Sequence, residues 1–301
     1  MVSKSVSNCV EALIGAHYVD GGLMAAIGFM KWLGMKVDLN HSLIDDAIKV
    51  ASLYSYAPKA DDIRVLESKL GYAFNTKGLL LEAITDGSER EGVGYCYERL
   101  EFLGDAALEV LITCYLYAKH RNLDNGMLAN LRSASVDNDS FALAAVRRNL
   151  YPHLQHSAFH MEEQISSFVK RVSGTSTVVP TSGIKGPKVL GDLVESIAGA
   201  VLIDSKLNLD EVWKVFKPIL SPIVKPDKLE LHPTRELREL CDSLGFFIKE
   251  HLFAKGDAMH AVLKLQLEDI VLDGQGSGKN GKAAKGMASL SLLKELEVER
   301  N

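Results

Sequence analysis

An almost unbroken helical pattern runs from Ile63 to Ile223 and constrains the fold of this 301-residue chain more than any other feature. Apolar residues recur there at spacings of three and four, within runs rich in leucine and alanine. That spacing is the period of an amphipathic α-helix, whereas strands would show apolar residues at alternate positions. One interruption, Ser173–Pro187, reads SGTSTVVPTSGIKGP and is predicted to be a flexible loop. The sequence therefore predicts a mainly α fold, with an all-helical domain over residues 61–224.

A different pattern begins after a cluster of prolines. Four of the eight prolines fall within the 16 residues from Pro218 to Pro233, which predicts a stiff linker where helices end. Beyond it, the pattern predicts the α-β-β-β-α order of a small sandwich, so residues 225–301 are predicted to be a separate domain. The predicted elements are a helix Thr234–Ser243, strands Phe246–Phe253 and His260–Leu267, a strand starting at Ile270, a turn at Gly274, Gly276 and Gly278, and a helix Lys282–Leu296.

The first 60 residues are predicted to be a short helical segment and a connector. Residues 1–36 read as one or two helices broken at Gly21-Gly22, and residues 37–60 read as a connector with some helix. We recognise no secretory signal and no run of 18 apolar residues, so we expect neither a leader nor a membrane span. The four cysteines lie far apart, which is typical of reduced thiols in an intracellular protein.

The densest group of acids lies in YERLEFLGD, Tyr97–Asp105. On a helix, Glu98, Glu101 and Asp105 share one face, while the other face is apolar and anchors the helix. The net charge of −5 argues against a nucleic-acid binder, which usually carries a basic surface. Carboxylates gathered around metal ions would, however, hide a local basic surface in that total.

A second acid pair, Asp192 and Glu195, is spaced i, i+3 among apolar residues. We expect this pair to be half-buried, and half-buried acids need a compensating charge. Oxygen ligands favour Mg²⁺ or Mn²⁺ over Zn²⁺, and ions held by two acidic helices could activate water beside a phosphodiester. The alternative is that both sets of acids are solvated helix faces.

Four segments resemble the ribonuclease III family, in the order in which that family has them. ERLEFLGDAAL resembles the family signature, and PKVLGDLVESIAGA resembles its second acidic motif. LESKLGYAF resembles the opening of the catalytic domain, and GMLANLRSASVDN the segment between the two acidic motifs. One departure is Asp86 in Thr85-Asp86-Gly87-Ser88, where the family often has histidine; it puts local packing in doubt more than chemistry.

The resemblance implies an all-helical catalytic domain that cuts double-stranded RNA. The products would carry 5′-phosphate and 3′-hydroxyl ends with a short 3′ overhang, and the cofactor would be Mg²⁺ or Mn²⁺. Glu98 falls on an accessory acid position, and Lys188 on a basic position near the scissile phosphate, against the alternative of a solvated loop lysine. The family's metal-ligand positions fall on Glu101, Asp105, Asp192 and Glu195.

A partial second copy of the catalytic motif lies near the start of the chain. CVEALIGA from Cys9 is similar to LVESIAGA from Leu193, so residues 1–36 resemble the end of a first ribonuclease III domain, joined by the connector 37–60. Asn8 stands where the other copy has Asp192, and no ERLEFLGD precedes it, so we expect no complete site in this copy. Two such domains followed by an RNA-binding domain resemble the C-terminal part of plant Dicer-like proteins, without the helicase and PAZ segments.

The family resemblance also implies partners. Ribonuclease III domains act in pairs, so Phe102 is either a core residue or a plug into a partner domain. We expect a homodimer or pairing with another ribonuclease III domain, duplex RNA as ligand, and an accessory double-stranded RNA-binding protein. No membrane is expected. The expected compartment is the nucleus or the cytoplasm, with the nucleus favoured by the resemblance.

Residues 225–301 resemble a double-stranded RNA-binding domain through GQGSGKNGKAAK. Lysines at a helix N-terminus form a natural phosphate clamp, and such domains read the shape of A-form RNA. The resemblance places Lys279, Lys282 and Lys285 in this clamp, while Gly281 occupies a position that is often lysine. His260 matches either a minor-groove loop histidine or a polar residue on a strand face, and we favour the second interpretation.

Two other functions compete with this prediction. A truncated Dicer relative could bind duplex RNA without cutting it, and this alternative stays open. A ferritin-like di-iron protein would need Glu-x-x-His pairs, and none accompanies these acids.

Overall fold

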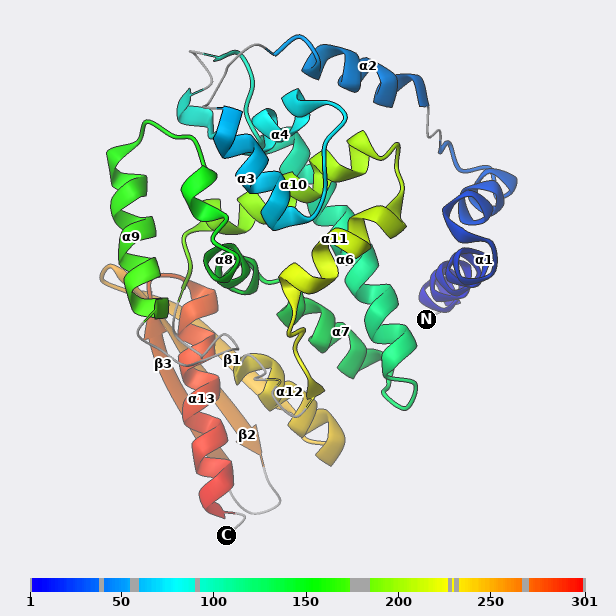
Figure 1. Ribbon diagram of the computed structural model, residues 1–301. Coiled ribbons are helices and arrows are strands. Elements are labelled where there is room, and N and C mark those ends of the chain that lie inside the picture. The colour runs from blue at the N-terminus through cyan, green and yellow to red at the C-terminus, as the bar shows by residue number, and fades with distance from the viewer. Residues whose placement is uncertain are drawn as a thin grey trace. The chain divides into compact units, whose positions relative to one another are not determined.

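The computed structural model describes residues 2–37, 41–54, 60–89, 93–173, 185–226, 229, 233–266 and 271–299 (Figure 1). They form two compact units: Met1–Ala107 with Leu150–Phe159 and Leu193–Pro218, and Leu108–Asn149 with His160–Asp192 and Ile219–Asn301. Helices α6 (Glu98–Lys119) and α10 (Lys188–Asp204) are continuous across this division. The mainly α fold is confirmed. The predicted domain boundaries stay predictions, and most of the predicted loop Ser173–Pro187 lies outside the described residues.

Short helices of the first unit pack around a core rich in leucine. At the end of α10, the carboxylate of Asp204 accepts hydrogen bonds from the backbone N–H groups of Asn75 and Thr76, at 2.9 and 2.8 Å. These bonds satisfy donors at the start of α4, which would otherwise lack helical partners. The elements of this unit are α1 (Val2–Trp32), α2 (His41–Ala51), α3 (Ala60–Leu70), α4 (Lys77–Ala83), the 3₁₀ turns Gly87–Glu89 and Tyr151–His153, the start of α6, most of α10, and α11 (Leu209–Leu220).

Helix α1 bends at Gly22, as the glycine pair predicted. Gly22 has φ of 72°, a left-handed conformation that glycine adopts because it lacks a Cβ. By length and composition alone, Lys4–Trp32 could cross a membrane, although we expected no such segment. Length and composition do not distinguish a membrane span from the core helix of a water-soluble protein.

In the second unit, two helices begin at aspartate caps. Asp124 accepts a hydrogen bond from the Met127 N–H at 2.7 Å and begins α7 (Asn125–Ser135). Asp137 likewise accepts from the Asp139 N–H and begins α8 (Asn138–Arg147), which precedes α9 (Phe159–Ser173). Such caps satisfy the first N–H groups of a helix and explain why both helices start where they do.

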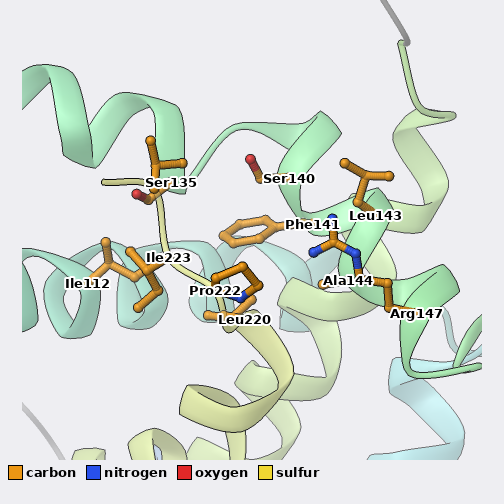
Figure 2. Close-up of a pocket in the computed structure, with 11 residues that line it drawn as sticks. Ile112, Ser135, Ser140, Phe141, Leu143, Ala144, Arg147, Leu220, Pro222 and Ile223 are labelled. Carbon is orange, nitrogen blue, oxygen red and sulfur yellow. The ribbon is translucent and has the colours of Figure 1, made fainter. Parts of the chain in front are cut away.

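The segment after α11 lies against helices of the same unit (Figure 2). Pro222 and Ile223 face Ile112 of α6 and Phe141 of α8 across a cavity of about 20 Å³. That volume is about the size of one water molecule, so the segment after α11 packs closely against these two helices.

The end of the chain has the predicted α-β-β-β-α order, which we call the tail. It comprises α12 (Pro233–Leu244), β1 (Ile248–Lys255), β2 (Ala258–Gln266), β3 (Val271–Gly278) and α13 (Gly281–Glu299). The strands form an antiparallel sheet in the order β1-β2-β3. Alternate residues of β2 (Ala261, Leu263, Leu265) are buried in a core with residues of α12 and α13. One face of the sheet is therefore covered by helices.

The predicted turn at Gly274, Gly276 and Gly278 is wrong, because all three glycines lie within β3. They alternate along the strand and share the face that packs against α13. A Cβ on Gly274 would lie 2.2 Å from the Ala288 carbonyl oxygen, and a Cβ on Gly276 2.3 Å from the Ala288 nitrogen. Glycine is needed here because the backbone of α13 lies directly on the strand.

Candidate active site

Helices α6 and α10 touch through their backbones at two glycines. A Cβ added to Gly104 on α6 would lie 1.7 Å from the carbonyl oxygen of Glu195 on α10. A Cβ added to Gly199 on α10 would lie 2.1 Å from the carbonyl oxygen of Leu100 on α6. Neither position has room for a side chain, so the glycines set how closely the two acidic helices approach. Neither glycine was among the predicted site residues, although Gly104 directly precedes Asp105.

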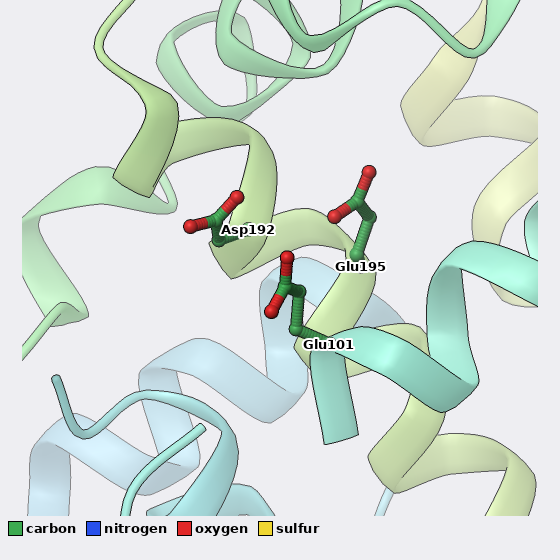
Figure 3. Close-up of side chains that lie close together, drawn as sticks. All are labelled: Glu101, Asp192 and Glu195. Atoms are coloured by element: carbon green, nitrogen blue, oxygen red, sulfur yellow. The ribbon is translucent and has the colours of Figure 1, made fainter. Parts of the chain in front are cut away.

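Three of the predicted acids come together on these helices (Figure 3). One carboxylate oxygen from each of Glu101, Asp192 and Glu195 lies within 4.8 Å of the other two. Glu101 comes from α6, whereas Asp192 and Glu195 come from successive turns of the continuous helix α10. Asp192 is buried and Glu195 is half-buried, as predicted for this pair. We call these three residues the acid cluster.

Asp192 forms an ion pair with a lysine of the same helix. The ammonium of Lys188 lies 2.7 Å from Asp192 Oδ1, one turn away along α10. Asp192 is 5% exposed, and a carboxylate this enclosed needs a compensating cation. Lys188 is the first residue of α10 and not a loop residue, and its place near the scissile phosphate stays a prediction. Its side chain is 74% exposed, which leaves the ammonium accessible to a ligand in solution.

Helix α10 is held at both sides of the acid cluster. At its start, the Gly186 N–H donates to Asp139 Oδ1 at 2.7 Å, and a Cβ on Gly191 would lie 2.2 Å from Asn138 Oδ1. Farther along, the Ser196 hydroxyl donates to the Ala83 carbonyl oxygen at 2.6 Å. These contacts fix the position and rotation of α10 and so fix the direction of its acids.

The other two predicted acids of α6, Glu98 and Asp105, are exposed and lie outside the acid cluster. Asp105 follows Glu101 by about one turn on the same helix. Glu98 is the first residue of α6, and the Cys96 thiol lies 3.6 Å from its Oε2. The shared helix was predicted correctly, and of its three acids Glu101 belongs to the acid cluster with the acids of α10.

A further carboxylate, Glu82 on α4, was missed. Burial raises the pKa of Glu82, and this outweighs the lowering effects of the nearby Arg99 guanidinium and of a hydrogen bond with Tyr54. Burial, with the negative charge of Glu82, also raises the pKa of Tyr54, whose ring stacks on Tyr95 with centroids 4.1 Å apart. Sequence analysis overlooked Glu82 because LLLEA reads as part of a core helix.

The acid cluster fits a hard divalent cation by the chemistry of its donors. Carboxylates brought this close repel one another unless a cation lies among them. Oxygen ligands of this kind suit Mg²⁺ and Mn²⁺. Glu101, Asp192 and Glu195 are the residues that would hold the ion.

Comparison with known proteins agrees with this geometry. Residues 98–206, which include the acid cluster, match the family described as Ribonuclease III domain. Residues 98–206 thus form a ribonuclease III domain. The predicted resemblance to a Dicer-like ribonuclease III region is also confirmed by the relatives that follow.

Two plant relatives match this chain along nearly its whole length. Endoribonuclease Dicer homolog 3 of Arabidopsis thaliana is 50% identical over 300 residues, which cover 99% of this chain and 19% of that protein. Endoribonuclease Dicer homolog 3b of Oryza sativa subsp. japonica is 47% identical over 304 residues, with coverage of 99% and 19%. The chain thus spans about a fifth of the length of these relatives. The nuclease domain of ribonuclease III from Campylobacter jejuni is 27% identical, with a TM-score of 0.43, over 56% of this chain and 100% of that one.

The departure from the ribonuclease III pattern at Asp86 is accommodated locally. Asp86 is buried, and its carboxylate accepts a hydrogen bond from the Ser88 N–H at 2.9 Å. Its own N–H donates to the Gln155 carbonyl oxygen at 2.9 Å, and the hydroxyl of neighbouring Thr85 donates to Leu81. An aspartate at this position therefore caps the 3₁₀ turn that follows.

Phe102 of the ribonuclease III domain lies on the surface of α6. Its side chain is 81% exposed, so the interpretation of Phe102 as a core residue is wrong. Its interpretation as a plug into a partner domain stays a prediction.

The lysines predicted to bind RNA differ in their surroundings. Lys279 and Lys282 are exposed at the start of α13. Lys285 instead forms an ion pair with Glu250 of β1, which also accepts from Arg238 at 2.9 Å. These hydrogen bonds lower the pKa of Glu250. A phosphate would have to compete with Glu250 for Lys285 but not for Lys282.

His260 lies within β2 and not in a loop. Its ring stacks on that of Phe253, its partner in the register of β1 and β2, with centroids 5.5 Å apart. The favoured interpretation as a strand-face residue is therefore confirmed. Strands β1 and β2 pair up to Lys255 and Ala258. The turn between them therefore has two residues and is too short to form a protruding loop.

Proposed function

We propose that this chain carries the metal-dependent cutting site of an endoribonuclease that acts on double-stranded RNA. The acid cluster of Glu101, Asp192 and Glu195, within a ribonuclease III domain, carries the proposal. The plant relatives are named as endoribonucleases, which supports RNA as the substrate. The proposed cofactor is Mg²⁺ or Mn²⁺, and the proposed role is Dicer-like RNA processing in RNA silencing.

In the proposed reaction, water attacks phosphorus and the bond to the 3′ oxygen breaks. The 3′ oxygen takes a proton, so the products carry 5′-phosphate and 3′-hydroxyl ends. A divalent ion bound here would activate water and offset negative charge on the leaving oxygen. Glu101, Asp192 and Glu195 would hold it, and Asp105 and Glu98 are the proposed outer acids of the site.

The protein's own contribution is to position these groups. The contact at Gly104 and Gly199 sets the distance between the two acidic helices. A side chain at either glycine would clash with the backbone of the opposite helix and push the two helices apart. Lys188 lies beside Asp192 with an exposed ammonium, where it can contact a non-bridging phosphate oxygen. Preorganised charge of this kind is usually the largest contribution to catalysis at a phosphate.

The tail is proposed to bind duplex RNA through the start of α13. Lys279 and Lys282 are exposed there, at a helix N-terminus that favours anions. Because Glu250 engages Lys285, we assign the larger contribution to Lys282.

Cutting both strands of a duplex requires two sites, and one ribonuclease III domain offers one. We propose that the exposed Phe102 face of α6 pairs with a second ribonuclease III domain, either in another copy of this chain or in a relative. A symmetric pair would bring two acid clusters to one RNA.

The decisive experiment incubates the purified 301-residue chain with end-labelled duplex RNA, with Mg²⁺ or with excess EDTA. We expect cutting with Mg²⁺ and none with EDTA. Glu195→Gln should nearly abolish cutting while leaving duplex binding unchanged, because it removes one ligand charge and no tail residue. Glu163→Gln, an exposed acid on α9, serves as the matched control and should cut normally.

Two outcomes contradict the proposal in different ways. Undiminished cutting in EDTA would rule out a metal-dependent site. A chain that binds duplex RNA but leaves it intact with either ion would favour the alternative, a non-cleaving double-stranded RNA-binding protein.

A further inference from the structure

The sheet of the tail has a second face that the proposed function does not use. Alternate residues of each strand point away from α12 and α13, opposite the buried Ala261, Leu263 and Leu265. We call this the open face. Its β1 strand is exposed along almost its whole length.

Three ring side chains gather on the open face. Phe253 and His260 are stacked across β1 and β2, with 14° between the ring planes. His251, two residues from Phe253 on the same strand, lies with its ring centroid 6.5 Å away. Phe253 remains 43% exposed, so the stack presents a flat π surface to solvent. A cross-strand ring pair stabilises a hairpin, but that role does not require the exposed surface.

Positive charge surrounds these rings. Lys249 and Lys264 are direct register partners on β1 and β2, and both are exposed. Like charges opposite one another destabilise a sheet unless an anion lies near both. Lys255 adds a third positive charge on this face. Among the described residues of the three strands, Asp273, the register partner of Lys264 on β3, is the acid on the open face, whereas Glu250 of β1 lies on the opposite face. The open face is thus locally basic although the whole chain carries a net charge of −5.

From this juxtaposition we infer that the open face binds single-stranded RNA. Bases stack on the Phe253–His260 pair, and the backbone phosphates contact Lys249 and Lys264. Exposed rings on a sheet recognise unpaired bases by stacking, and nearby lysines hold the backbone. This would be a second RNA surface, separate from the acid cluster and from the start of α13.

The chemistry favours a single strand over the other occupants. A duplex hides the flat surfaces of its bases within its own stack, so it could use the lysines but not the rings. A second copy of the same face would bring a second set of these lysines into the contact, which adds like charge. An unpaired strand matches both the rings and the charges.

The test measures binding of a fluorescent oligouridine of about ten nucleotides to the full 301-residue chain, in EDTA so that RNA stays intact. We expect Phe253→Ala to weaken binding about tenfold, and Phe253→Tyr to retain it, because tyrosine keeps the ring. Phe247→Ala is the matched control: Phe247 is 87% exposed, directly before β1, and its loss should leave affinity unchanged. Replacing Lys249 and Lys264 together by Ala should reduce the salt dependence by about 1.4 units of slope.

Two further measurements separate this inference from the proposed function. Phe253→Ala should still unfold cooperatively, with only a small loss of stability from the missing ring pair, which excludes loss of the fold as the cause. Lys282→Ala should weaken duplex binding and leave oligouridine binding intact. The inference is overturned by a chain that does not bind oligouridine, by equal affinity in Phe253→Ala, or by a concentration-dependent dimer that Phe253→Ala abolishes. The last result would make the open face a contact between copies.

Discussion

Lys188 Nζ lies 2.7 Å from Asp192 Oδ1, so the cation nearest this acid is part of the protein itself. A divalent ion must share Asp192 with this ammonium. We therefore predict that Lys188→Ala binds Mn²⁺ more tightly than the parent chain, by about tenfold or less because solvent screens an exposed lysine. Calorimetric titration with Mn²⁺, without RNA, measures this. Lys185→Ala, an exposed lysine just before α10, should behave as the parent chain, and weaker Mn²⁺ binding in Lys188→Ala would contradict the prediction.

The glycine contact predicts a loss of both stability and metal binding. Gly104→Ala or Gly199→Ala would place a methyl group inside the backbone of the opposite helix, so we expect a loss of about 3 kcal/mol in the free energy of unfolding. Forcing the helices apart also separates Glu101 from the acids of α10, so Mn²⁺ affinity should fall in the folded fraction. Gly15→Ala is the control, because Gly15 lies in a helix with open space around its Cα. Wild-type stability in Gly104→Ala would show that the contact does not constrain the helices.

Because burial raises the pKa of Glu82, replacing this residue should increase the stability of the folded chain in a pH-dependent way. Its folded-state pKa is raised above the usual value of 4.5, so charging Glu82 costs more in the folded chain than in the unfolded one. This cost is absent below pH 4.5 and grows as the pH rises through the raised pKa. Glu82→Gln should therefore melt at a higher temperature than the parent chain at pH 7, and the difference should shrink toward pH 4. The exposed Glu163→Gln should show no such trend, and a pH-independent difference in Glu82→Gln would contradict the assignment.

The exposed side chain of Phe102 leads us to predict that pairing of two ribonuclease III domains and cleavage of both RNA strands depend on each other. Phe102→Arg places a charge on a side chain that is 81% exposed, so the monomer should fold normally while an apolar contact at this face is lost. Sedimentation should show weaker pairing, and cleavage of both strands should decrease, with duplex binding by the tail unchanged. Phe159→Arg, at a residue 84% exposed on α9, is the matched control. A Phe102→Arg chain that sediments as a monomer yet cuts both strands at the parent rate would end the proposed need for a pair.

The acid cluster was largely predictable because its spacing is set by helix geometry. Glu98, Glu101 and Asp105 share a helix, and Asp192 and Glu195 share another, which periodicity alone can show. Which acid of α6 faces α10 depends on how two helices pack. Gly104 and Gly199 lie at that contact, but the need for glycine at these positions can be seen only when the backbone of the opposite helix is known.

The tail shows a second limit of sequence reasoning. Gly274, Gly276 and Gly278 were assigned to a turn because glycine disfavours strands, and the helix that justifies them is a tertiary neighbour. Lys285 was assigned to a phosphate clamp, yet it lies beside Glu250, which is 35 residues away in sequence. Local patterns predict an element and its face, but not the partner that the face meets.

The three glycines of β3, Gly274, Gly276 and Gly278, also affect the order in which the elements of the tail can fold. On its helix-facing side β3 carries three glycines and the side chain of Leu272 alone, so it buries little apolar surface until α13 covers it, and glycine loses the most backbone entropy on ordering. Strand β3 and helix α13 should thus form as one cooperative folding unit. A nascent or proteolysed chain that ends before Ala284 would keep at most the β1–β2 hairpin, and an isolated hairpin is marginally stable in water.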